Sequence, residues 1–290
     1  MFPRRTKRAA TLAVVFAIAL GIGLFFFLRG PEAPEEQIAP TTSAPRETTI
    51  GSSVQNRTIK AFTFGHGTKK LLFVGGIHGG YEWNSVHLAY TFMDYLEANP
   101  SAIPDNLKIT VIPSVNPDGV YKIIGKEGRF TAADVPSAAD QSPGRFNANN
   151  VDLNRNFDCK WQSESTWRNR AVSAGTAPFS EPESRAIRDF VLKNQPAAVI
   201  FWHSQANAVY ASECKNGILP QTLAIMNAYA KASGYPAVKT FDSYAVTGDA
   251  EGWLASINIP AITVELKTHE TIEWNKNLPG ILALFEYFSR

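Results

Sequence analysis

Apolar runs and amphipathic segments alternate along most of the chain. Short apolar runs bounded by turn residues predict strands at 58–64, 69–74, 107–112, 197–202 and 261–266. Apolar residues at helical spacing predict helices at 82–96, 180–194, 218–233, 251–256 and 278–288. Because apolar strands alternate with amphipathic helices, we expect an α/β sheet that is covered by helices on both faces.

The stretch 116–178 shows little periodicity. A long segment without regular structure is unusual inside a compact domain unless it forms the wall of a functional site. We therefore expect a single domain from about residue 50 to residue 290, with this stretch beside its site.

A basic head, residues 1–8, precedes an apolar run at 9–28. About 20 residues at 1.5 Å each cover the hydrocarbon core of a bilayer, roughly 30 Å thick. A cleaved signal peptide would need a shorter apolar core and a small-residue cleavage site, and no clear site follows. The run therefore predicts a transmembrane anchor, with an uncleaved or a cleaved signal as the alternative.

The flanking charges place the basic head in the cytoplasm and the rest of the chain outside it, at the cell surface or in the periplasm. A cleaved segment would release the same part as a secreted protein. Residues 29–53 are rich in Pro, Glu, Ala, Thr and Ser and predict a solvated linker. The functional domain is then expected at 54–290.

Composition excludes some functions. A net charge of +2 offers no electrostatic basis for binding nucleic acid. Two cysteines are too few for a disulfide scaffold, and a hydrophobic fraction of 44% is ordinary for a globular protein.

Three residues form a candidate metal site. His78 and Glu82 lie in a glycine-rich turn after the strand at 69–74, where residues without a Cβ let the backbone turn tightly. An imidazole and a carboxylate are common zinc ligands. His203, at the end of a buried strand, is the best candidate for a third ligand; an ordinary surface turn and a hydrogen-bonded strand-end histidine are the alternatives. The settings of His66, His87 and His269 are less suitable.

Three protein ligands leave a fourth zinc position for water, as in catalytic sites. Hydrolysis of an amide also needs a group that accepts the proton of that water. Glu265 ends an apolar strand and is the candidate base; a solvated strand-end carboxylate is the alternative, and Glu270 and Glu273 are nearby competitors.

Asn154 and Arg155 form a candidate carboxylate-binding pair. A guanidinium beside an amide can hold a carboxylate by charge-assisted hydrogen bonds, and Asp152 could orient the pair. A polar turn is the alternative.

Taken in order, His78-x-x-x-Glu82, Asp152-x-Asn154-Arg155, His203 and Glu265 resemble the zinc metallocarboxypeptidases of the carboxypeptidase A (M14) family. The resemblance covers residues 55–290 and is closest to the compact bacterial members. It implies a three-layer α/β/α domain with a mixed, mostly parallel sheet. It further implies one Zn²⁺ held by the two histidines and Glu82, with Glu265 as general base.

The resemblance also implies roles in substrate binding. Asn154 and Arg155 would grip the terminal carboxylate of a peptide, and Arg145 would polarise the scissile carbonyl. Tyr244 looks like the mobile tyrosine that closes over the substrate. The implied function is hydrolysis of the C-terminal peptide bond.

The chain departs from the family pattern near its side-chain pocket, where Asp249 and Glu251 occur. An acid there would favour a basic C-terminal residue or the diamino acid of a bacterial wall peptide, although both acids could be solvated instead. A murein peptide amidase or wall-peptide carboxypeptidase is therefore the alternative function. A non-catalytic module that binds C-termini is a third, but it would have no use for Glu265.

Cys159 follows the Asn-Arg segment, and Cys214 follows the strand that ends at His203. Outside the cytoplasm a disulfide between them is favoured, with two separate thiols as the alternative.

Overall fold

The computed structural model describes residues 44–136 and 140–290. The basic head, the apolar run at 9–28 and most of the predicted linker lie outside the described residues. Within the described residues, helices are too short or too polar to cross a bilayer.

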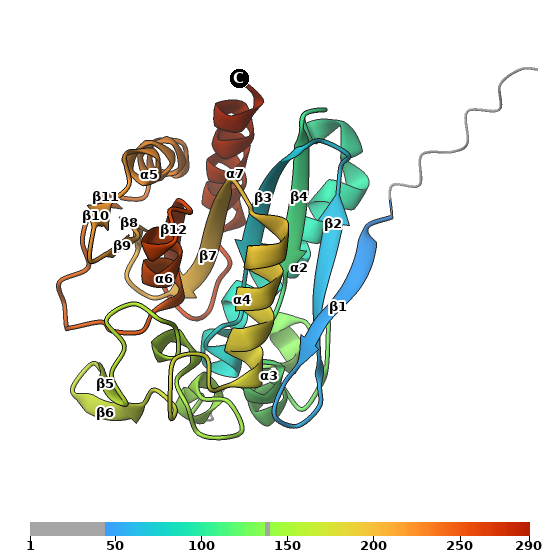
Figure 1. The fold of residues 1–290 in the computed structure, drawn as a ribbon. Coiled ribbons are helices and arrows are strands. Elements are labelled where there is room, and N and C mark those ends of the chain that lie inside the picture. Colours follow the sequence, from blue (N-terminus) through green and yellow to red (C-terminus); the bar gives the residue numbers. More distant parts are fainter. Residues whose placement is uncertain (1–43, 137–139) are drawn as a thin grey trace, which may run out of the picture. The chain divides into compact units, whose positions relative to one another are not determined.

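The core of the fold is an eight-stranded mixed sheet (Figure 1). Its order is β1-β2-β4-β3-β7-β12-β8-β11. The strands are β1 (Arg46–Ser52), β2 (Thr58–Phe64), β3 (Lys69–Val74), β4 (Leu107–Ile112), β7 (Ala198–Ser204), β8 (Ala208–Ala211), β11 (Ala237–Val238) and β12 (Ala261–Leu266). The central strands β4, β3, β7 and β12 are parallel. Strands β1 and β2 pair antiparallel with their neighbours, and β8 is antiparallel to β12 but parallel to β11. The mixed, mostly parallel α/β sheet is confirmed.

Helices cover both faces of this sheet. The main helices are α2 (Trp83–Ala98), α3 (Pro117–Ile124), α4 (Pro182–Asn194), α5 (Pro220–Ser233), α6 (Ala250–Ser256) and α7 (Trp274–Ser289). Residues of α2, α5 and α7 pack in one core cluster, and residues of α4 and α6 pack in another on the opposite face. Figure 1 shows α4 and α6 together on one side of the strands.

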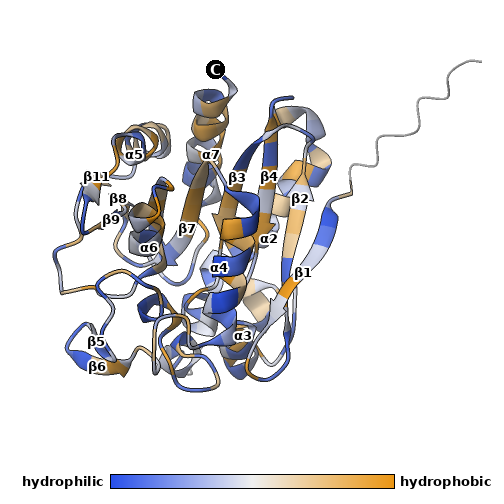
Figure 2. Ribbon diagram, viewed as in Figure 1, coloured by the Kyte–Doolittle hydropathy of each residue, from blue (hydrophilic) through white to orange (hydrophobic). Residues whose placement is uncertain are grey.

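Successive side chains along each central strand point to opposite faces of the sheet and so enter the two core clusters in turn. On β3, Leu71 and Phe73 enter the first cluster, whereas Leu72 and Val74 enter the second. Both faces are buried, so the central strands are apolar throughout, and Figure 2 shows β3 and β7 mainly in orange beside a much bluer α4. This is why their boundaries can be read from apolar runs alone.

One predicted boundary is wrong. The linker was expected to extend to residue 53, but Arg46–Ser52 forms strand β1, which pairs antiparallel with β2. As an edge strand it exposes most of its side chains, and Ile50 is its one apolar residue. Because apolar and polar residues do not alternate along it, this strand cannot be predicted from the sequence pattern.

The aperiodic stretch beyond β4 is structured. It holds α3, the 3₁₀ turns η3 (Ala132–Asp134), η4 (Ser142–Arg145) and η5 (Leu153–Arg155), and the hairpin of β5 (Glu164–Trp167) with β6 (Arg170–Ser173). This stretch has no repeating apolar pattern, and side-chain hydrogen bonds stabilise it instead. Asn156, for example, is fully buried and donates to the carbonyls of Ala174 and Ala177.

Candidate metal centre and active site

The candidate site lies where three adjacent parallel strands end. His78 follows β3, His203 is near the end of β7, and Glu265 is near the end of β12, directly opposite His203 in the strand register. In α/β sheets the carboxyl ends of parallel strands meet at one edge, which is the usual location of a functional site. Residues far apart in the sequence therefore converge here.

The turn that carries two of the candidate ligands depends on glycine. The 3₁₀ helix η1 (Gly79–Glu82) brings Glu82 back toward His78. Gly79 has a φ of +48°, and a Cβ there would lie 2.5 Å from the Gly144 carbonyl oxygen and 2.9 Å from the Gly119 Cα. Only a glycine allows this close approach of backbone segments.

The side chains of His78, Glu82 and His203 converge on one point. Glu82 Oε1 lies 2.8 Å from His78 Nδ1, Glu82 Oε2 lies 3.0 Å from His203 Nδ1, and the two Nδ1 atoms are 3.2 Å apart. All three residues are buried. Among the described residues they form the group whose donor atoms lie close enough to hold a metal ion.

This donor set fits zinc. Ligand atoms about 2.0–2.1 Å from a tetrahedral zinc lie roughly 3.3 Å from one another, close to the observed separations. Burial alone would raise the pKa of Glu82, but His78 and His203 outweigh it and hold that pKa well below its usual value. Burial alone would lower the pKa of His203, but Glu82 and Glu251 raise it well above normal. The cluster thus stabilises positive charge at the point where zinc would bind.

Each histidine also has a carboxylate on its outer side. His78 Nε2 lies 3.4 Å from Asp152 Oδ1, and His203 Nε2 lies 3.1 Å from Glu251 Oε1. Asp152 is completely buried, and despite that burial Arg145 and Arg155 hold its pKa well below the usual range. It is therefore an anion in the folded protein.

Glu265 lies beside the candidate ligands but pairs with no cation among the described residues. Its Oε2 accepts a hydrogen bond from the Ala206 amide at 3.2 Å. Burial raises the pKa of Glu265 to about 7, and the nearby carboxylates of Glu82 and Glu251 act in the same direction. A carboxyl group with such a pKa is suited to exchange protons at neutral pH.

Arg145 is held next to the metal ligands. Its Nε and one terminal nitrogen both donate to Asp152 Oδ2 at 2.8 Å, and its other terminal nitrogen is 3.7 Å from Glu82 Oε1. Its guanidinium lies 4.7 Å from the centre of the Trp167 ring. This places a fixed positive charge beside the point at which the ligands converge.

Arg155 is buried but pairs with no carboxylate in the described part of the chain. Its donors reach only backbone carbonyls, those of Thr166 and Asn154. Asn154 accepts a hydrogen bond from the Ala250 amide through Oδ1, which fixes its side chain. A buried guanidinium without a counter-ion is a strong candidate for binding an anion.

These residues line one cavity of about 780 Å³. Its lining includes the metal group, Glu265, Arg145, Asn154, Arg155, Tyr244, Asp249, Glu251 and Cys159, but not Asp152 or Cys214. Tyr244 lies in the coil 241–248 with its ring 4.9 Å from that of Phe241. The walls also include Tyr81, Lys160, Trp167 and Arg168.

The two acids near the expected side-chain pocket have other contacts as well. Glu251 accepts hydrogen bonds from the Thr263 hydroxyl and faces His203. Asp249 is the N-cap of α6 and accepts from the Gly252 amide at 2.6 Å. Burial, together with Glu251, raises the pKa of Asp249 to about 6. Neither acid is simply solvated.

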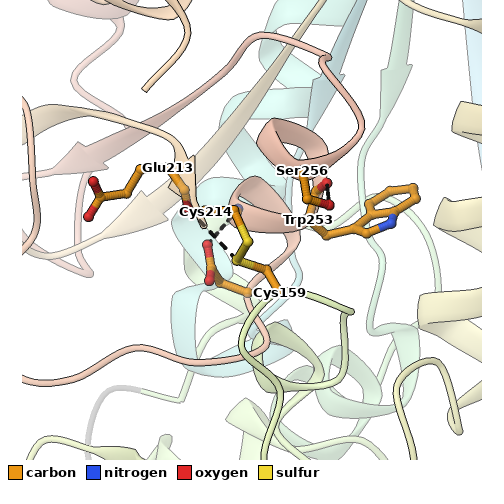
Figure 3. Close-up of a disulfide and its surroundings, with 7 residues drawn as sticks. Cys159, Glu213, Cys214, Trp253 and Ser256 are labelled. Atoms are coloured by element: carbon orange, nitrogen blue, oxygen red, sulfur yellow. Dashed lines mark hydrogen bonds between the residues drawn. A yellow bond between two sulfur atoms is a disulfide. The ribbon is translucent and has the colours of Figure 1, made fainter. Parts of the chain in front are cut away.

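A disulfide joins Cys159 to Cys214, with a Cα–Cα distance of 6.0 Å (Figure 3). It connects the loop after Asn154 and Arg155 to β9 (Glu213–Cys214), and it lies against α6, whose Trp253 and Ser256 appear beside it in Figure 3. A hydrogen bond also holds the backbone of Cys159 independently of the bridge, since the Gly248 amide donates to the Cys159 carbonyl at 2.7 Å. Of the two cysteines, Cys159 lines the cavity, so the bridge ties this part of the cavity wall to β9.

Two features of this site are not evident from the sequence. Asp152 caps the turn that carries Asn154 and Arg155, accepting from the Asn154 amide at 3.1 Å, as expected, but its side chain also bonds to Arg145 and faces His78. The aromatic wall of Tyr81 and Trp167, with ring centres 5.1 Å apart, had no signal, because it depends on a hairpin within the aperiodic stretch.

The fold and the buried His-Glu-His group define a metal-binding α/β protein with the ligand set of a catalytic zinc site. The family model of zinc carboxypeptidases, Peptidase M14, matches residues 41–279. The chain therefore belongs to the M14 zinc carboxypeptidase family.

Its relatives include a diamino acid endopeptidase and a carboxypeptidase. Gamma-D-glutamyl-L-diamino acid endopeptidase 1 of Lysinibacillus sphaericus is 29% identical over 241 residues, which cover 76% of this chain and 60% of that protein. Carboxypeptidase B of Astacus astacus is 29% identical over 154 residues, or 50% of this chain and 48% of that protein. The chain thus spans between about half and 60% of the length of these relatives.

A solved structure supports the fold. The murein-tripeptide amidase of Escherichia coli O157 superimposes with a TM-score of 0.60 at 24% identity, over 83% of this chain and 92% of the other.

Proposed function

We propose that the protein is a zinc-dependent metallocarboxypeptidase that hydrolyses the C-terminal peptide bond of its substrate. The observation that carries this proposal is Arg155, a buried guanidinium with no carboxylate at ion-pair distance among the described residues, in the same cavity as the metal group and Glu265. Such a guanidinium would bind a free carboxylate, and with Asn154 it would set which peptide bond reaches the ligands.

His78, Glu82 and His203 would hold the zinc ion, which lowers the pKa of a bound water and polarises a carbonyl. Glu265 would take a proton from the attacking water and deliver it to the leaving amine. Arg145, fixed by Asp152, would stabilise the negative charge that develops on the carbonyl oxygen.

The test compares the wild type with Glu265→Gln on peptides that have a free or an amidated C-terminus, with products read by mass. The wild type should remove one residue from free C-termini only and lose activity in a chelator. Glu265→Gln should be slower by roughly 10²–10⁴-fold at unchanged zinc content. Wild-type rates in this variant would refute the role of Glu265.

A wall-peptide substrate is the second candidate, and the rim of the cavity favours it. Lys160 and Arg168 line the cavity and pair with no carboxylate among the described residues, and the acid Asp249 lies in the same cavity. A substrate with additional carboxylates and an amino group in its side chain would match these charges. A γ-glutamyl-diamino acid bond, the type named for the Lysinibacillus sphaericus relative, joins residues of this kind.

This candidate is tested with a γ-D-glutamyl-diamino acid peptide and its analogue in which the glutamyl α-carboxylate is an amide. Arg168→Gln should lower kcat/KM for the carboxylate form more than for the amide. Arg170→Gln is the matched control, since Arg170 is exposed on the same hairpin but does not line the cavity. Equal effects on both peptides would exclude Arg168 as the group that binds this carboxylate.

We also propose that the N-terminal run 9–28 anchors a catalytic domain that lies outside the cytoplasm. The supporting observations are the length and apolar character of that run, the basic residues before it, and the Cys159–Cys214 disulfide, which is typical of oxidising compartments. Membrane fractionation with N-terminal sequencing of the mature protein would separate a retained anchor from a cleaved signal.

A further inference from the structure

The carboxylate of Glu251 lies against the outer nitrogen of His203. Glu251 Oε1 is 3.1 Å from His203 Nε2, and both residues are only 2–3% exposed. Thr263 Oγ1 donates to the same oxygen at 3.1 Å. The contact joins α6, which carries Glu251, to β7 and β12, which carry the other two residues.

The two nitrogens of His203 have different neighbours. Nδ1 faces His78 and Glu82, so it is the nitrogen that would bind the metal. The proton of a neutral imidazole must then lie on Nε2, where the Glu251 carboxylate can accept it. Such a contact fixes both the tautomer and the orientation of a metal-binding histidine.

A similar but longer contact, without hydrogen-bond geometry, occurs at His78. Its Nδ1 faces the other ligands, and its Nε2 lies 3.4 Å from the buried Asp152. Each histidine therefore has one buried carboxylate beside its outer nitrogen, and the two carboxylates come from different parts of the chain. Asp152 is the N-cap of η5, and Glu251 lies in α6.

We infer that Glu251 is a positioning residue for the metal ligand His203, and that it is not a free acid that selects the side chain of the substrate. Oε1 of Glu251 already accepts from His203 and Thr263, so an ammonium group of a substrate would have to share this carboxylate with His203. The inference rests on the metal centre of the proposed function.

The test measures the zinc affinity of the purified metal-free protein by competition with a chelator. Glu251→Ala should bind zinc 10–100-fold more weakly, the usual effect of removing such a partner. Glu251→Gln should lose less, since its amide oxygen can still accept the Nε2 proton. Thr263→Val should cause a smaller loss in the same direction, because it removes the second contact to Glu251.

Asp249→Asn is the matched control. It lies two residues away in the same cavity, and asparagine can still cap α6. Its zinc affinity should stay within twofold of the wild type. The unfolding temperature of each metal-free variant separates a folding defect from weaker binding.

The preference for a basic over an apolar C-terminal residue is measured in the same variants. Unchanged zinc affinity in Glu251→Ala would overturn the inference, and a simultaneous loss of the basic preference would assign Glu251 to the side-chain pocket. Failure of the wild type to bind zinc would instead refute the metal site itself, so the two failures are distinguishable.

Discussion

At the scale of single residues, the site uses buried carboxylates in two different ways. Glu82 and Asp152 are held as anions by the histidines and arginines around them. Among the described residues Glu265 and Asp249 form no ion pair, and burial raises the pKa of each more strongly than His203 and Arg155, respectively, lower it. The same residue type is therefore fixed in charge at one position and able to titrate near neutral pH at another.

The raised pKa of Glu265 should affect the stability of the metal-free protein. Its carboxyl group has a pKa of about 7 in the folded protein and about 4.5 when unfolded, so the native state holds this proton more strongly over that interval. The free energy of unfolding should fall as pH rises from about 4.5 to 7. In Glu265→Gln this fall should be shallower in urea titrations across the same pH range, and an unchanged slope would contradict it. In Glu265→Gln, Asp249 should still cause the free energy of unfolding to fall as pH rises, mainly below pH 6.

Arg155→Ala should weaken recognition of the free C-terminus. Losing charge-assisted hydrogen bonds worth about 1.5–3 kcal/mol should lower kcat/KM for free peptides roughly 10–100-fold, mainly through KM. Steady-state kinetics on free and amidated forms of one peptide provide the measurement. A loss of equal size on the amidated peptide would show that Arg155 does not bind the terminal carboxylate.

At the scale of elements, close backbone packing shapes the turn that carries the ligands. Gly79→Ala should reduce both stability and zinc affinity, because its Cβ would clash with the Gly144 carbonyl at a positive φ. Gly125→Ala is the matched control: its φ is +73°, but no atom lies within 4 Å of the added Cβ. The control should cost about 1 kcal/mol of unfolding free energy and leave zinc binding unchanged. Similar effects of the two variants would argue against the clash.

The disulfide should contribute more to stability than to catalysis. It closes a sequence separation of 55 residues, for which the loss of chain entropy predicts about 4 kcal/mol. Equilibrium unfolding of a Cys159→Ser/Cys214→Ser variant should show this loss. Because hydrogen bonds through Gly248 hold the Arg155 loop independently, KM should change little. A variant as stable as the oxidised wild type would contradict the prediction.

At the scale of the whole molecule, the edge strand β1 belongs to the folded unit. A chain starting at residue 53 lacks β1 and exposes the edge of β2, whereas one starting at residue 44 keeps both. The shorter chain should be less stable and more prone to associate, since unpaired strand edges pair with other chains. Unfolding curves and size-exclusion chromatography of the two chains give the comparison. Equal stability and elution would show that β1 is dispensable.

How much of the fold can be predicted from the sequence depends on the kind of contact that stabilises each element. Strands such as β3, β4 and β12 are bounded where predicted, because both faces are buried and their apolar runs end at turn residues. Strands β1, β5 and β6 give no such signal. β1 and β6 are largely exposed, and β5 has only four residues, of which Trp167 is the one apolar residue.

The sequence by itself determined the alternating strands and helices and the order of the residues that form the site. Burial of apolar side chains leaves a periodic record along the chain, and the chemistry of a zinc ligand or a base limits which residue types can occur. Only the tertiary structure decided which carboxylate faces which cation. It placed Asp152 beside His78 and Arg145, and Glu251 beside His203. These pairings join elements distant in the chain, and their strength depends on distance and burial, which no local pattern records.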